Sequence, residues 1–179
     1  MIEVEAKVTV KSPSVMRARI RSLAKRSVTL HKIDDYYTLE NLKTYPQKSL
    51  RIRKMGKIYQ INFKQSLSFK HHIHAKKETE FSVGAIDDFL SLLSEFGFKR
   101  WVRKEKRSEI YTLGKHFHIE LNNVKGLGWF VEVEYLAQPS EVAYAQKEVM
   151  KVLSLLGFKE QDCVEEGYTK LLWDRTRKH

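Results

Sequence analysis

The stretch that decides the fold is Ile2-Glu3-Val4-Glu5-Ala6-Lys7-Val8-Thr9-Val10-Lys11 at the amino terminus. Apolar and polar residues alternate along it without a break, which is the period of a β-strand with one buried face. The polar face places Glu3 and Glu5 about 7 Å apart, with the amine of Lys7 one step further along. This face is either the solvated side of a surface strand, or a site whose carboxylates bind a divalent cation while the lysine holds an anion.

The composition is that of a folded and basic protein. The 179 residues fit a single domain, which we predict to span residues 1–179, and they suffice to bury a core. Lys and Arg number 33 against 22 Asp and Glu, and the resulting charge of +11 attracts polyanions without selecting one class of them. No apolar run is long enough to cross a membrane, and we expect no signal peptide because Met1 leads directly into the charged strand. With Cys163 as the single cysteine, a reducing cytoplasm is the expected location.

The rest of the chain continues the strand pattern, interrupted by three helical stretches. We expect helices over 13–24, 84–98 and 139–156, and extended segments over 30–39, 50–53, 58–64, 74–81, 101–112, 117–122 and 130–136. The polar segment 65–73 is predicted to be a loop, and residues 168–173 are predicted to pack back on the domain. The fold class is therefore α+β with about eight strands.

Most predicted strands have one apolar and one charged face, and the helices can cover only the apolar faces. Two architectures fit: an open sheet with a solvated charged face, or a closed antiparallel eight-stranded β-barrel with a polar interior and helices packed on the outside. Because burying an unpaired ion costs several kcal/mol, a closed interior would require a charged guest. A phosphate chain chelated to a divalent metal suits such an interior, since carboxylates bind the metal and cations bind the phosphate oxygens. The charged residues that closure would turn inward are Glu3, Glu5, Glu78, Glu80, Glu120, Glu132, Glu134, Lys7, Arg51, Arg53, Lys64 and Lys76.

Glu3-x-Glu5-x-Lys7 resembles the amino-terminal motif of the CYTH superfamily, the triphosphate tunnel metalloenzymes. This superfamily includes class IV adenylyl cyclases, thiamine triphosphatases and inorganic triphosphatases. Further motifs follow in the family's order over nearly the full length: Asp34-Asp35-Tyr36-Tyr37, Leu50-Arg51-Ile52-Arg53, Lys64, Lys76-x-Glu78-x-Glu80, Gly126-Leu127-Gly128-x-Phe130, Glu132-x-Glu134 and Tyr168-Thr169-Lys170-Leu171-Leu172. The resemblance implies a closed triphosphate tunnel with metal on its acidic side and triphosphate on its basic side.

Carried over position by position, the resemblance assigns roles to individual residues. It implies that Mg²⁺ or Mn²⁺ is bound by Glu3, Glu5, Glu132 and Glu134, that phosphate is bound by Lys7, Arg51, Arg53, Lys64 and Lys76, and that Glu78 and Glu80 line the tunnel wall. Where the family usually has an aspartate this chain has Asn122, so the remaining metal ligand is either Asn122 or Glu120. The family's second basic pair matches Lys104 and Lys106 by spacing, whereas Arg107 has the usual identity, so the register there is open.

Three functions are compatible with these residues. The first is hydrolysis of inorganic triphosphate, ATP or thiamine triphosphate, in which Lys7 or Tyr36 helps to orient the attacking water. The second is cyclisation of ATP to cyclic AMP and pyrophosphate, which requires an adenine pocket that no identified residue provides. The third is a basic module that binds nucleic acid, which is disfavoured because acids accompany the bases on the same faces. We therefore expect hydrolysis, with a triphosphate-containing small molecule as partner, and we leave open whether the chain forms a homodimer.

Overall fold

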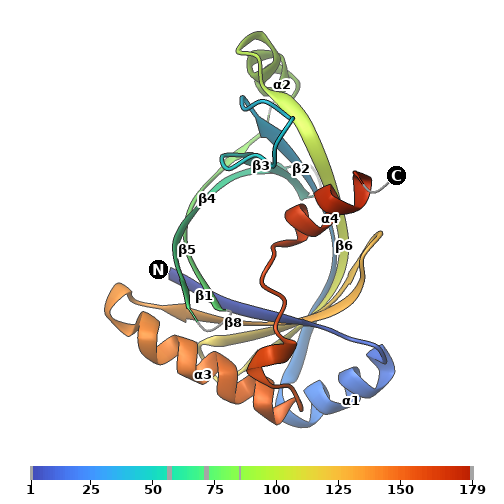
Figure 1. Ribbon diagram of the computed structural model, residues 1–179, viewed down its shortest axis with the longest axis vertical. Coiled ribbons are helices and arrows are strands. Elements are labelled where there is room, and N and C mark those ends of the chain that lie inside the picture. The colour runs from blue at the N-terminus through green and yellow to red at the C-terminus, as the bar shows by residue number, and fades with distance from the viewer. Residues whose placement is uncertain (1, 56–57, 71–72, 85, 178–179) are drawn as a thin grey trace. The chain divides into compact units, whose positions relative to one another are not determined.

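The computed structural model describes residues 2–55, 58–70, 73–84 and 86–177, with residues 55, 64–70 and 73–78 described by their backbone alone. Within these residues the fold is α+β with an eight-stranded antiparallel sheet, as the sequence predicted (Figure 1). The described residues form four α-helices, one more than the three that were predicted, because residues 168–176 are helical. None of the described helices is long and apolar enough to cross a membrane. The elements, in chain order, are β1 (Ile2–Thr9), α1 (Pro13–Leu23), β2 (Lys25–Thr38), β3 (Leu50–Met55), β4 (Ile58–Lys70), β5 (Ile73–Val83), α2 (Ile86–Glu95), β6 (Lys99–Leu113), β7 (Phe117–Val124), β8 (Gly128–Ala137), α3 (Val142–Leu155) and α4 (Tyr168–Thr176), with short 3₁₀ turns at Pro139–Glu141 and Glu160–Asp162.

Two further segments differ from the sequence-based expectation. The polar segment 65–73 was expected to be a loop, but residues 65–70 continue β4. Polar residues extend a strand when the neighbouring strand supplies partners for their backbone groups, so polarity alone was a misleading guide here. Strand β2 begins at Lys25, earlier than the expected start at residue 30, because α1 ends at Leu23 and Ala24 already has extended dihedral angles.

The chain divides into two compact units, and the single domain over 1–179 stays a prediction. The first unit comprises Met1–His31, Lys64–Glu78 and Lys106–Glu166. In it β1 lies between β5 and β8, while β8 pairs with β7 and β7 with β6, all antiparallel. The register places Val4 opposite Tyr135 and Ala6 opposite Val133. The apolar side chains of β1 and β8 therefore share one face, and their charged side chains share the other.

Helices α1 and α3 cover the apolar face of the first unit. Figure 1 shows α3 lying along β1 and β8, with α1 on the same side. Pro13 opens α1 at a position where its missing N–H costs no hydrogen bond. Ile20 of α1 and Leu153 of α3 are fully buried in one core cluster with Val4, Val8, Ile119, Leu121, Val131 and Val133. The helices thus fix which face of each strand is left for polar residues.

The second unit comprises Lys32–Phe63, Thr79–Glu105 and Gly167–His179. Its strands β2, β3 and β4 pair in that order, and a smaller core of Ile52, Ile61, Ile86 and Leu93 joins β3 and β4 to α2. The carboxyl-terminal residues pack within this unit, as predicted for 168–173. The Tyr45 hydroxyl lies 2.8 Å from the Thr169 hydroxyl, and Arg177 donates hydrogen bonds to the carbonyls of residues 42 and 43.

Helix α3 allows a matched test of the first core. Leu153 is fully buried, whereas Leu155 on the same helix is 65% exposed. We expect Leu153→Ala to lower the free energy of unfolding by about 2–5 kcal/mol, because the site loses packing contacts and cannot fully collapse. Leu155→Ala should change it by less than about 0.5 kcal/mol. Urea unfolding of both variants checks this, and equal losses would contradict the assignment of Leu153 to the core.

Candidate metal and phosphate site

The polar face of the first unit gathers carboxylates from three strands. In the strand register, Glu5 of β1 lies opposite Glu134 of β8, and Glu132 of β8 lies opposite Glu120 of β7. Residues opposite each other in an antiparallel pair project to the same side, so all of these carboxylates share a face with Glu3. Sequence alternation predicted each of them to be polar-face residues, and the register brings them together.

The carboxylates form two triads that share one member. Glu3, Glu5 and Glu134 each offer an oxygen within 4.8 Å of the others, and Glu120, Glu132 and Glu134 do the same. Oxygens on opposite sides of an octahedral Mg²⁺ stand about 4.2 Å apart, so each triad is close to the spacing that this ion requires. Burial raises the pKa of Glu134, and the neighbouring carboxylates, Glu120 first, raise it further. This side chain therefore lies where negative charge is most concentrated.

A lysine and an asparagine complete the second triad. The ammonium nitrogen of Lys106 lies 2.6 Å from Oε2 of Glu120 and 3.1 Å from Oε2 of Glu132. Asn122 donates a 2.7 Å hydrogen bond from Nδ2 to the same Glu132 oxygen. Burial lowers the pKa of Lys106, but the charges of Glu132 and Glu120 outweigh it, so its pKa lies above the ordinary value. Lys106 therefore serves as a cation of the acidic cluster.

Lys7 lies on the same face, and its position agrees with the motif at the amino terminus. It is buried and lies opposite Glu132 in the register of β1 and β8. Its backbone carbonyl accepts a 2.8 Å hydrogen bond from the amide of Val164, which ties the strand to the segment following α3. The ammonium group of Lys7 thus shares its side of the strand pair with carboxylates.

The second unit carries a cluster of opposite sign on β2, β3 and β6. Asp34 is fully buried and accepts hydrogen bonds of 2.6 and 2.9 Å from Nε and Nη2 of Arg53. The ammonium nitrogen of Lys104 lies 3.1 Å from the same carboxylate. Arg51 lies opposite Tyr36 on this face, and its buried Nε has no hydrogen-bond partner among the described residues. An unsatisfied, buried guanidinium nitrogen suits an incoming anion.

The excess of positive charge affects both acidic groups of this cluster. Burial raises the pKa of Asp34, but Lys104 and then Arg53 outweigh that effect and hold it well below the ordinary value. Burial also raises the pKa of the Tyr36 hydroxyl, and the nearby charge of Lys104 reverses this shift, so that the pKa lies below its usual range. The cluster therefore stabilises negative charge on any group that enters it.

Not every predicted site residue is found in these clusters. Lys104 and Lys106 are buried, whereas Arg107 is exposed. The family's second basic pair therefore corresponds to Lys104 and Lys106, as their spacing suggested, and Arg107 is not part of it. Glu80 is exposed and lies 3.5 Å from Nδ2 of Asn62. The side chains of Lys64, Lys76 and Glu78 lie outside what the structure describes.

The structure also adds residues that the sequence did not single out. Asp34 was noticed only as part of a motif, yet it is the counter-ion of Arg53 and Lys104. Lys106, which the family resemblance suggested as a phosphate ligand, contacts the carboxylates of Glu120 and Glu132. The alternation of β2 places Asp34 and Tyr36 on one face, and this pattern could have identified both as site residues from the sequence. Their partners could not be identified in this way, because they depend on which strands pair and in which register.

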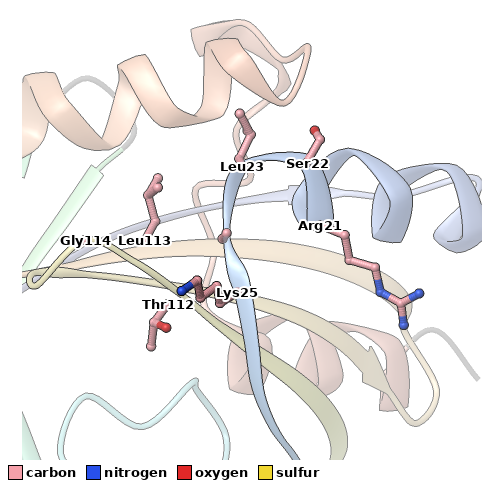
Figure 2. A pocket seen from close by; sticks show the side chains of 8 residues that line it. Arg21, Ser22, Leu23, Lys25, Thr112, Leu113 and Gly114 are labelled. Atoms are coloured by element: carbon pink, nitrogen blue, oxygen red, sulfur yellow. The ribbon is translucent and has the colours of Figure 1, made fainter.

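A surface pocket in the first unit is separate from these clusters. Figure 2 shows it at the end of α1 and the turn after β6, lined by Arg21, Ser22, Leu23, Ala24, Lys25, Thr112, Leu113 and Gly114. Its lining contains no carboxylate and none of the predicted site residues. We assign it no part in the site.

Comparison with known families gives one match over most of the chain. A family model with the description CYTH domain matches residues 1–168. Comparison with curated proteins gives no match. The family match covers β1 to β8 and includes all the carboxylates and cations described above.

Solved structures with similar folds include proteins from three kinds of organism. The PH1012 protein of Pyrococcus horikoshii OT3 is 29% identical, with a TM-score of 0.81 and coverage of 94% of this chain and 98% of that one. HpAC1 of Hippeastrum, described as a candidate adenylyl cyclase with a dominant triphosphatase activity, is 15% identical, with a TM-score of 0.61 and coverage of 98% and 96%. The Mimivirus capping enzyme triphosphatase is 12% identical, with a TM-score of 0.53 and coverage of 88% and 90%. At these identities the last two show a shared fold alone.

The buried Asp34 gives a prediction with a neighbouring control. Asp34→Asn should lower the free energy of unfolding by about 3–5 kcal/mol at pH 7, because it leaves Arg53 and Lys104 without their buried counter-charge. The pKa of Asp34 is lower in the folded than in the unfolded chain, so this contribution is fully present at neutral pH and is lost progressively as the pH falls below the unfolded value of 3.8. The difference between wild type and variant, measured by urea unfolding, should therefore stay nearly constant from pH 7 to pH 5 and shrink below pH 4.

Asp35→Asn is the control. Asp35 pairs with Arg103 and Arg100, whose side chains are more than half exposed, and it should contribute less than about 1 kcal/mol. If the two variants lose equal stability at pH 7, Asp34 is not the central ion of this cluster.

Proposed function

The chain belongs to the CYTH family, and we propose that it is a divalent-metal-dependent triphosphatase that cleaves inorganic triphosphate to pyrophosphate and phosphate. The observation that carries the proposal is the triad of Glu3, Glu5 and Glu134, whose oxygens lie within 4.8 Å of one another. Hard carboxylate oxygens at this spacing suit Mg²⁺ or Mn²⁺. The proposal includes closure of the eight strands into a tunnel, as the family resemblance implies.

We assign different roles to the residues of the two clusters. Glu3, Glu5 and Glu134 would hold the divalent ion, which when bound neutralises negative charge on the phosphate chain. Arg51, Arg53 and Lys104 bind non-bridging phosphate oxygens, and Arg51 has a buried donor available for this purpose. These contacts hold the phosphate chain in place and stabilise the charge of the leaving group.

Orientation of the attacking water falls to Lys7 or Tyr36. Lys7 is buried beside the carboxylates. The lowered pKa of the Tyr36 hydroxyl makes its deprotonated form, which can accept a proton from water, more accessible. Lys64 and Lys76 remain proposed phosphate ligands on the strength of the family motif. Asn122 is proposed to orient Glu132 through its 2.7 Å hydrogen bond, while Glu120 supplies the acidic group two residues earlier.

Hydrolysis is favoured over cyclisation because the described cations suit phosphate oxygens and no described group is arranged to read adenine. Contacts to the triphosphate group, without any nucleoside, would then provide most of the free energy of substrate binding.

The metal triad gives the first test. Glu3→Gln keeps the size of the side chain but removes its charge, so phosphate release from inorganic triphosphate should fall at least about a hundredfold. EDTA should abolish turnover of the wild type, and Mn²⁺ should restore it. The control is Glu148→Gln, since Glu148 lies on α3 and pairs with Lys151. Near-normal turnover of Glu3→Gln, with or without added Mn²⁺, would reject this metal site.

The second test separates hydrolase from cyclase. Inorganic triphosphate and ATP are each incubated with Mg²⁺ or Mn²⁺, and the products are resolved by anion-exchange chromatography. We expect a higher kcat/KM for inorganic triphosphate, and we expect Arg51→Ala to lower it for both substrates by about 2–5 kcal/mol of transition-state free energy. Arg103→Ala, which removes an exposed guanidinium paired with Asp35, should leave both rates unchanged. Cyclic AMP as the main product from ATP, with inorganic triphosphate left intact, would replace the hydrolase by the cyclase.

A further inference from the structure

The two carboxylate triads share Glu134 but differ in their surroundings. In the triad of Glu120, Glu132 and Glu134, the Lys106 ammonium lies 2.6 and 3.1 Å from oxygens of the first two carboxylates. Lys106 is 6% exposed, and both of these carboxylates are 5% exposed. The ammonium therefore stands inside the acidic cluster, at hydrogen-bond distance from the oxygens that would otherwise bind a metal ion.

We propose that Lys106 occupies the cation position of this second triad, so that the protein binds one divalent ion, at Glu3, Glu5 and Glu134, instead of two. This inference rests on the proposed metal-dependent function and specifies the metal content of its site. Mg²⁺ binds carboxylate oxygens at 2.0–2.1 Å, and an ammonium hydrogen-bonded to the same oxygens takes up the space and repels the dication.

Asn122 is a second observation that points to this position. It is fully buried, its Nδ2 donates to Glu132, and its Oδ1 has no hydrogen-bond partner among the described residues. The amide is neutral, so it adds an oxygen to the surroundings of the triad without adding charge. Without the lysine, the Asn122 oxygen would be available as a further ligand for a metal ion.

The test counts ions bound to the full chain in the absence of substrate, because a triphosphate would bring its own metal-binding oxygens. Mn²⁺ is titrated into metal-free protein and followed by isothermal titration calorimetry and by the electron paramagnetic resonance signal of unbound Mn²⁺. We expect one ion per chain for the wild type and two for Lys106→Met. Adding Asn122→Ala to Lys106→Met should weaken the second ion at least about tenfold.

Lys104→Met is the matched control, because Lys104 lies two residues away on β6, is 7% exposed and pairs with Asp34. It should still bind one ion. Two ions on the wild type, or one ion on a folded Lys106→Met, would overturn the inference. No ion on the wild type would instead reject the proposed metal-dependent function. If circular dichroism shows that Lys106→Met does not fold, Lys106→Gln replaces it. The number of Mn²⁺ ions bound by the wild type still tests the inference, because two ions would overturn it.

Discussion

A buried charge must be offset by a nearby opposite charge, and this constraint governs both polar clusters. Asp34 is fully buried because Arg53 and Lys104 donate to it, and Lys106 is buried because Glu120 and Glu132 accept from it. Without such partners each ion would cost several kcal/mol. The pairs lie within one unit in each case, so each cluster is organised before any ligand arrives.

The apolar faces of the same strands determine where these ions lie. Val4 and Val133 lie under α1 and α3, and Ile52 and Ile61 lie against α2, so the charged neighbours of these residues must turn to the other side. A slip of one residue would exchange the faces and expose the core, which makes the register of β1 against β8 costly to change. The position of the carboxylates is thus a consequence of hydrophobic packing, and α1, α2 and α3 contribute to it by covering the apolar faces.

Sequence alternation predicted the α+β class, the strands and the polar-face placement of Glu3, Glu5, Glu120, Glu132 and Glu134, because a period of two residues depends only on local pattern. It did not predict that Lys106 contacts carboxylates or that Asp34 pairs with Arg53. Both facts depend on contacts between strands that are distant in the chain. The segment 65–70 was wrongly expected to be a loop, because its strand character comes from pairing rather than from its own residues.

The two clusters carry net charges of opposite sign. On the polar face of the first unit, Glu3, Glu5, Glu120, Glu132 and Glu134 accompany the cations Lys7 and Lys106, and the repulsion among the carboxylates raises the pKa of Glu134. In the second unit, Arg51, Arg53 and Lys104 accompany Asp34, and the pKa of that carboxylate is lowered. Like charges held together by packing destabilise the protein without ligand, and the same repulsion is relieved when a counter-ion binds. The first cluster therefore favours a cation and the second an anion.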